Sequence, residues 1–163
     1  MKNLSRSIVF LFILFLSFSS VLAMGQIDKT KQVEKIAPNF SLSDLDGKTV
    51  TLASFKGKNV ILFFWATWCH FCRKSLVDLE GKFPALKDKG IVVLGIDIGE
   101  PSQKIKDFLK KYPASFPVLL DVKGGIAEEY NVIGIPTYVF IDAKGNIKST
   151  DNSLPTNYTS VFK

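Results

Sequence analysis

"WATWCHFC" at residues 65–72 contains both cysteines of this 163-residue chain, Cys69 and Cys72, and its only histidine, His70. An unbroken apolar run, "NVILFFW" at residues 59–65, comes directly before the first cysteine and is typical of a central strand buried on both faces. After it, apolar residues recur every three or four positions, which predicts a helix beginning near Cys69. The two cysteines are therefore expected where a strand passes into a helix.

A thiol at a helix N-terminus meets unpaired backbone N–H groups and the positive end of the helix dipole, and both lower its pKa. Cys69 takes this position, and the charge of Arg73, four residues further on, acts in the same direction. Cys72 is expected to face Cys69 from a deeper, less exposed place in the helix. We therefore predict that Cys69 attacks a partner's disulfide and that Cys72 resolves the mixed disulfide.

Two other interpretations of the cysteine pair are weaker. A permanent disulfide between residues three apart closes too small a loop to stabilise a fold much. Structural zinc needs four ligands, and the sequence offers one Cys-x-x-Cys pair and His70, which would point away from the sulfurs. Copper needs fewer ligands, but the chain has no second histidine. We expect no metal and no cofactor other than the redox-active Cys69–Cys72 disulfide.

The N-terminus has the pattern of an export signal. Lys2 and Arg6 precede an apolar stretch over residues 8–23, and small residues allow cleavage after Ala23. The sequence predicts a signal peptide over residues 1–23, with an uncleaved N-terminal anchor as the alternative, although the run is slightly short for a membrane span. Export leads to a periplasmic or other extracytoplasmic compartment, where disulfides persist.

Residues 24–36 are polar and are interpreted as a linker, followed by one domain over residues 37–163. The formal net charge of +6 comes from basic residues scattered along the chain, which indicates a solvated surface and no nucleic-acid partner. We expect a monomer.

Strands and helices alternate along the domain, which indicates an α/β fold with a central mixed sheet flanked by helices. An Asp46–Gly47 turn predicts an N-terminal β-hairpin, and Gly81 and Pro84 are expected to break or bend the helix after Cys69. Further strands are expected at "IVVLGIDI", "FPVLLD" and "TYVFID", helices at "PSQKIKDFLKKY" and "GGIAEEYNV", a hairpin through "AKGN" to "IKST", and a short helix in "LPTNYTSVFK".

Pro136 in "VIGIPTYVF" stands directly before an apolar strand. A cis Ile135–Pro136 bond would turn the backbone and expose the backbone groups of Ile135 for pairing with an incoming peptide. A trans proline that simply starts the strand fits the residues equally well.

A strand that ends in Trp-Cys-x-x-Cys at a helix start, with Ile-Pro-Thr before a later strand, resembles the thioredoxin superfamily. Within it, residues from about 37 to 146 resemble the TlpA/ResA/DsbE-like thiol–disulfide oxidoreductases, which are related to AhpC/TSA redoxins. The resemblance implies a thioredoxin-like fold, a strand–helix insert before Pro136, and a cis Pro136 packed against the disulfide. It also implies an active-site shell, which consists of Trp68, His70, Phe71, Ile135, Pro136 and Thr137.

Three positions depart from these families. Thioredoxin keeps a buried aspartate where this chain has Phe63, and many ResA-like members keep a glutamate where it has Ser75 and a proline where it has Val77. By these rules no buried carboxylate is placed to assist deprotonation of Cys72. His70 is expected either to stabilise the Cys69 thiolate or to be a surface residue at the substrate groove.

The expected activity is dithiol–disulfide exchange with protein clients. Most such relatives act as reductants, often in cytochrome c maturation, and receive electrons from a membrane-bound thiol donor. One alternative is a peroxiredoxin-like thiol peroxidase, but Ala66 and Leu62 stand where peroxiredoxins place threonine and proline. The other is a copper- or haem-pathway binding module that uses the same thiols.

Overall fold

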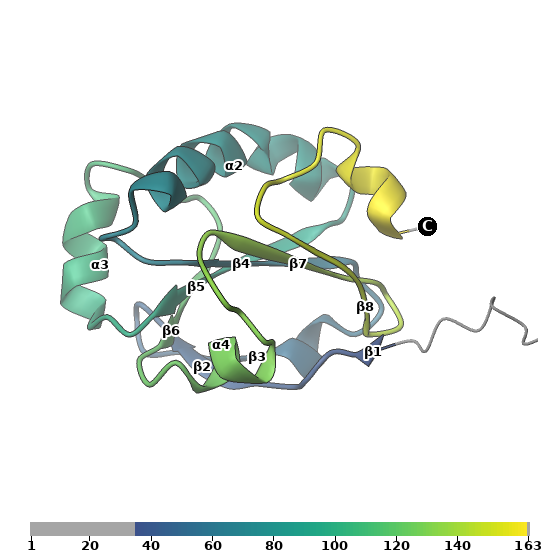
Figure 1. The fold of residues 1–163 in the computed structure, drawn as a ribbon, viewed down its shortest axis with the longest axis horizontal. Coiled ribbons are helices and arrows are strands. Elements are labelled where there is room, and N and C mark those ends of the chain that lie inside the picture. Colours follow the sequence, from purple (N-terminus) through teal and green to yellow (C-terminus); the bar gives the residue numbers. More distant parts are fainter. Residues whose placement is uncertain (1–34, 163) are drawn as a thin grey trace, which may run out of the picture. The chain divides into compact units, whose positions relative to one another are not determined.

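An eight-stranded mixed sheet runs through residues 35–162, which are the residues that this computed structural model describes (Figure 1). The predicted signal peptide or anchor over residues 1–23 lies outside the described residues, as does the predicted linker up to residue 34. The first strand, β1 (Lys35–Ile36), falls at the end of that linker. Along residues 35–162, no helix is both long enough and apolar enough to cross a membrane.

The strands lie in the order β1-β8-β7-β4-β5-β6-β2-β3. Their bounds are β2 Ser41–Asp44, β3 Thr49–Thr51, β4 Val60–Trp65, β5 Val92–Ile98, β6 Val118–Asp121, β7 Thr137–Ile141 and β8 Asn146–Asp151. The helices are α2 His70–Asp88, α3 Ser102–Leu109 and α4 Gly125–Glu129, with 3-10 helices η1 Leu52–Phe55 and η2 Tyr158–Phe162. This arrangement confirms the predicted α/β class, the strand–helix insert before Pro136 and the short C-terminal helix.

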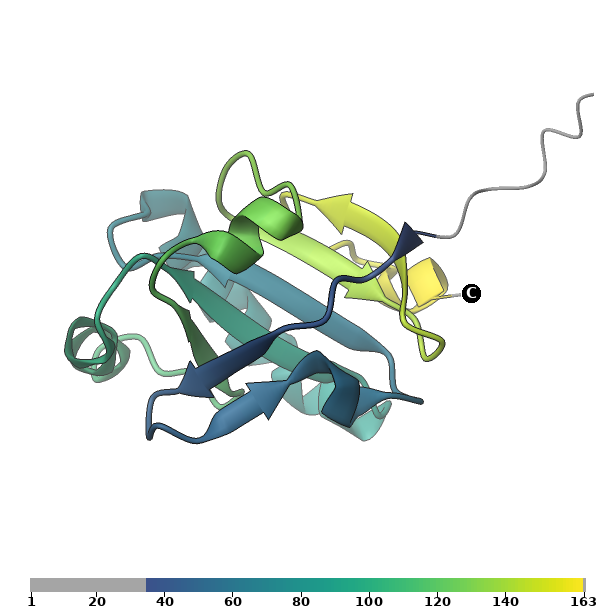
Figure 2. The ribbon, with the colours of Figure 1, turned by 90° about the horizontal axis from the view of Figure 1, so that it is seen from below.

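β4 is the central strand, parallel to β5 and antiparallel to β7. All six of its side chains are buried, because each face of the sheet is covered. Ile61, Phe63 and Trp65 point into the core under α2 and α3, while the alternate residues point into a second core beneath α4. Figures 1 and 2 show α2 on one face and α4 with η1 on the other.

The predicted N-terminal hairpin is confirmed as β2 and β3. Asp44 closes its turn, since one carboxylate oxygen accepts hydrogen bonds of 2.9 Å from the backbone N–H groups of Asp46 and Lys48. Gly47 has a φ of +83°, a conformation that glycine adopts without strain. β2 also pairs with β6, which joins the hairpin to the main sheet.

Gly81 and Pro84, which were expected to break or bend the helix after Cys69, do not break it. α2 continues through Gly81 and Pro84 and ends at Asp88. Pro84 removes one backbone donor, but it lies on the exposed side of the helix, while Leu79 and Leu86 are buried against the sheet on either side of it. Burial of these leucines outweighs the lost hydrogen bond, so packing overrides the local signal.

Candidate active site

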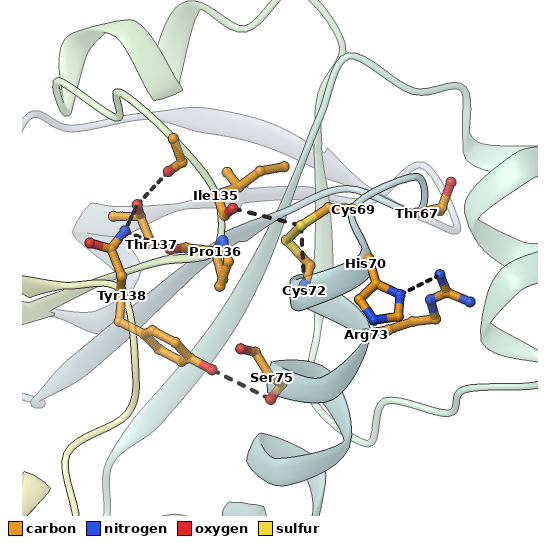
Figure 3. Close-up of a disulfide and its surroundings, with 12 residues drawn as sticks. Thr67, Cys69, His70, Cys72, Arg73, Ser75, Ile135, Pro136, Thr137 and Tyr138 are labelled. Carbon is orange, nitrogen blue, oxygen red and sulfur yellow. Dashed lines mark hydrogen bonds between the residues drawn. A yellow bond between two sulfur atoms is a disulfide. The ribbon is translucent and has the colours of Figure 1, made fainter.

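Cys69 and Cys72 form a disulfide at the N-terminus of α2, just past the end of β4 (Figure 3). Cys69 is the N-cap residue, and its sulfur accepts a hydrogen bond of 3.1 Å from the backbone N–H of Cys72. Cys69 is 6% exposed, whereas Cys72 is fully buried. The predicted placement of both cysteines is confirmed. On reduction, the N–H of Cys72 would stabilise a thiolate on Cys69.

The loop before β7 comes to the disulfide from a distant part of the sequence. The Ile135–Pro136 peptide bond is cis, which confirms what the family resemblance implied. The backbone oxygen of Ile135 lies 3.7 Å from the sulfur of Cys69, and Figure 3 shows Pro136 beside the disulfide. Thr137 stabilises this loop, because its hydroxyl donates a hydrogen bond of 2.6 Å to the backbone oxygen of Gly134.

Asn152, just beyond β8, supports the same loop and was missed at the sequence level. Its side-chain amide donates hydrogen bonds to the backbone oxygen of Pro136 at 2.9 Å and to the hydroxyl of Thr137 at 3.4 Å. Replacing Asn152 by alanine is expected to destabilise the fold by about 1 kcal/mol. Hydrogen exchange of the backbone N–H groups around the loop is expected to speed up selectively. Equal acceleration at the distant β2–β3 hairpin would contradict this local role.

Exposed aromatic and apolar residues lie next in sequence to the cysteines and to the cis-proline loop. Trp68 and Phe71 are 67% and 73% exposed, and Ile133, two residues before Ile135, is fully exposed. His70 contacts the ring of Phe71 edge-on. We call Trp68, Phe71 and Ile133 the apolar rim, because exposed apolar side chains near a reactive disulfide are typical of a surface that contacts another protein.

The charge of Arg73 is directed along the outside of α2. Its guanidinium lies 3.4 Å from His70 Nδ1 and 5.9 Å from the ring centre of Tyr112. Figure 3 shows both His70 and Arg73 on the side of the helix away from the sulfurs. The effect of the Arg73 charge on the Cys69 thiol stays a prediction, and the contacts of the guanidinium are with His70 and Tyr112.

Phe63 and Ser75, which stand where relatives keep acidic residues, both contact Tyr138. Phe63 stacks on Tyr138 with a ring-centre distance of 4.9 Å. The backbone oxygen of Ser75 accepts a hydrogen bond of 3.4 Å from the Tyr138 hydroxyl. Burial raises the pKa of Tyr138 to about 12, so this hydroxyl keeps its proton at neutral pH.

Two buried acidic residues, which were not predicted from the sequence, lie near the site. Asp97 ends the buried part of β5, and Glu100 follows in the loop before α3. Both oxygens of Glu100 accept hydrogen bonds from Thr67, two residues before Cys69, at 2.6 Å from the backbone N–H and 2.7 Å from the hydroxyl. The signal in the sequence that could have pointed to Asp97 was the presence of one acidic residue inside the apolar run "IVVLGIDI".

A thioredoxin-like sheet that presents a Cys-x-x-Cys disulfide at a helix start, opposite a cis-proline loop, defines a thiol–disulfide oxidoreductase. The model of the AhpC/TSA family matches residues 33–150, and the chain belongs to this family. It is 38% identical over 142 residues to the thiol-disulfide oxidoreductase ResA of Bacillus cereus, covering 86% of this chain and 82% of that protein.

Two solved structures show the same fold. The thioredoxin domain of a thiol-disulfide oxidoreductase from Bacteroides vulgatus is 28% identical with a TM-score of 0.70, covering 78% of this chain and 94% of that one. A secreted disulfide oxidoreductase of Mycobacterium tuberculosis, described as homologous to DsbE of E. coli, is 32% identical with a TM-score of 0.63. That match covers 72% of this chain and 84% of the other. The chain is therefore a ResA/DsbE-like thiol–disulfide oxidoreductase.

Proposed function

We propose that this protein is an extracytoplasmic reductant of protein disulfides, with Cys69 as the attacking thiol and Cys72 as the resolving thiol. The observation that carries the proposal is the unequal environment of the two sulfurs. Cys69 caps α2, receives the N–H of Cys72 and faces the cis-proline loop, whereas Cys72 is fully buried. An incoming sulfur can approach only the first of the two.

The exchange then proceeds in two balanced steps. The Cys69 thiolate attacks one sulfur of a client disulfide, the other client sulfur leaves as a thiolate, and a mixed disulfide forms. Cys72 loses its proton to water or to the client thiolate, and its thiolate attacks the Cys69 sulfur, which releases the second client sulfur as a thiolate and closes the Cys69–Cys72 disulfide. Two electrons pass from the protein to the client, and a membrane-bound dithiol donor restores the reduced pair while becoming a disulfide itself.

The location and pathway rest on other observations. The positive start and apolar stretch of residues 1–23 favour export, and one similar structure is of a secreted protein. The resemblance of residues 37–146 to TlpA/ResA/DsbE-like oxidoreductases, most of which act as reductants, favours a reducing role of the kind used in cytochrome c maturation. We propose a monomer that acts outside the cytoplasm, tethered if the N-terminal segment is retained.

Trapping in cells tests the proposal. With Cys72→Ser, the mixed disulfide between Cys69 and a client cannot be resolved, so client adducts are expected to accumulate and to disappear on reduction. The double variant with both cysteines replaced by serine is the matched control. If the single variant yields no more adducts than the double variant, exchange with protein clients is refuted. Adducts located only in the cytoplasm would refute the extracytoplasmic part.

The apolar rim of Trp68, Phe71 and Ile133 is proposed to contact clients. Ile133→Ser is expected to slow reduction of a protein disulfide several-fold, while reduction of oxidised glutathione stays unchanged, since that small disulfide needs no rim contact. Ile36→Ser is the matched control, because Ile36 is also exposed but lies on β1, which pairs with β8 away from the cysteines. Equal loss in both variants, or equal loss with both substrates, would contradict a role of the rim.

A further inference from the structure

Two buried carboxyl groups lie directly behind the loop that carries Cys69. Asp97 is fully buried and Glu100 is 3% exposed. Asp97 of β5 is the register partner of Trp65, the last residue of β4, and the loop from Trp65 leads to Cys69 within four residues. Nothing in the proposed exchange steps uses either acid.

The two acids have unequal partners. Glu100 accepts the two hydrogen bonds from Thr67 and an ion-pair contact of 2.6 Å from the Lys104 ammonium. Within residues 35–162 no donor lies in close hydrogen-bond geometry to either oxygen of Asp97, whose hydrogen-bonding interactions are with Glu100. A buried negative charge is stable only where donors surround it, so the charge belongs on Glu100 and the proton on Asp97.

The pKa shifts agree with this distribution. Burial, and then the negative charge of Glu100, raise the pKa of Asp97 to about 8. Burial also raises the pKa of Glu100, but hydrogen bonds from Lys104 and Thr67 outweigh it and hold that pKa below its usual range. A proton on Asp97 also lets the two carboxyl groups share a hydrogen bond, and this interaction raises the pKa of Asp97 and lowers that of Glu100.

Few other charges face Asp97. Glu100 and Lys104 are the charged groups that act on it. The neighbouring Trp65 on β4 carries no charge, and Asp121 of β6 turns to the other face of the sheet, where it accepts a hydrogen bond from the backbone N–H of Ala127. The site therefore holds one proton, one negative charge and one lysine cation.

We propose that Asp97 is a positioning residue of the redox centre, whose proton allows Glu100 to hold Thr67 and with it the loop that carries Cys69. When Asp97 loses its proton, two carboxylates face each other in a buried site with a single lysine. Their repulsion weakens the hold on Thr67 and adds negative charge behind Cys69, which disfavours its thiolate. The inference rests on the proposed role of Cys69.

In the oxidised protein the titration of Asp97 can be followed without interference from the cysteines, because neither thiol titrates while the disulfide is closed. We expect the backbone N–H resonance of Thr67 to pass through one transition near pH 8 in an NMR titration from pH 5 to 10. Asp97→Asn is expected to abolish the transition. Asp107→Asn is the matched control, since Asp107 is an exposed α3 carboxylate bound to Lys110, and it should leave the transition in place.

Stability gives a second readout. Between pH 3.8, which is the ordinary pKa of aspartate, and about pH 8, Asp97 stays protonated in the folded protein, whereas in the unfolded chain it has lost its proton. The folding constant of the wild type therefore falls by up to tenfold for each pH unit across this window, and Asp97→Asn removes that slope. A wild-type protein without the Thr67 transition, or a variant that keeps both the transition and the slope, would overturn the proposal.

Kinetics separate this inference from the proposed function. With reduced protein and oxidised glutathione, the wild type is expected to react several-fold more slowly than Asp97→Asn above pH 8 and equally fast below pH 7. If neither protein exchanges at any pH, the proposed function has failed. If both exchange with one identical pH profile, only the role of Asp97 has failed.

Discussion

Serine in place of Cys69 is expected to lower catalysed reduction of insulin by dithiothreitol to the rate of dithiothreitol alone. The serine hydroxyl is not ionised at neutral pH and therefore cannot attack a disulfide as the thiolate does. The fold should be unaffected, since Cys69 caps α2 with its side chain and serine is a preferred N-cap residue. Turbidity from precipitating insulin chains gives the rate, and circular dichroism checks the fold.

Cys72→Ser is the matched control for this experiment. It removes the same disulfide but leaves the Cys69 thiol, so the variant is expected to form a mixed disulfide once and then stop. Mass spectrometry of the protein after reaction with oxidised glutathione should show one glutathione adduct on Cys72→Ser and none on Cys69→Ser. The reverse pattern would show that the assigned roles of the two cysteines are exchanged.

Aspartate in place of Phe63 is expected to destabilise the fold severely, although thioredoxin keeps an aspartate there. Phe63 is fully buried, stacks on Tyr138, and lies parallel to the ring of Trp65 at 6.3 Å. Removing a buried phenylalanine costs about 3–5 kcal/mol, and the new carboxyl adds the cost of an unpaired buried polar group. This loss is comparable with the whole stability of many domains.

Urea unfolding at neutral pH measures this effect, with Phe63→Leu as the control. Leucine keeps the site apolar, so its cost should be roughly 1–2 kcal/mol. If Phe63→Asp loses no more than Phe63→Leu, the site behind the cysteines can hydrate or pair a carboxyl group. The acid of thioredoxin would then be transferable to this chain, contrary to our interpretation of the aromatic stack.

Much of the fold could be predicted from the sequence because the deciding signals are local. The apolar run of β4, the helical periodicity after Cys69 and the Asp46–Gly47 turn each depend on residues close together in the chain. The extension of α2 through Pro84 was missed for the opposite reason. Its cause is burial of leucines against the sheet, and local propensity contains no information on that packing.

The sequence by itself determined the reactive pair, since spacing alone places Cys69 at a helix start and Cys72 one turn further on. Tertiary structure decided what surrounds that pair. It placed the cis Ile135–Pro136 bond next to the sulfur of Cys69, which is 66 positions earlier in the chain. It also placed Glu100 where it accepts a hydrogen bond from the backbone N–H of Thr67. Such partners meet only across the sheet, where strand order and burial, rather than neighbouring residues, fix which side chains touch and which acid keeps its proton.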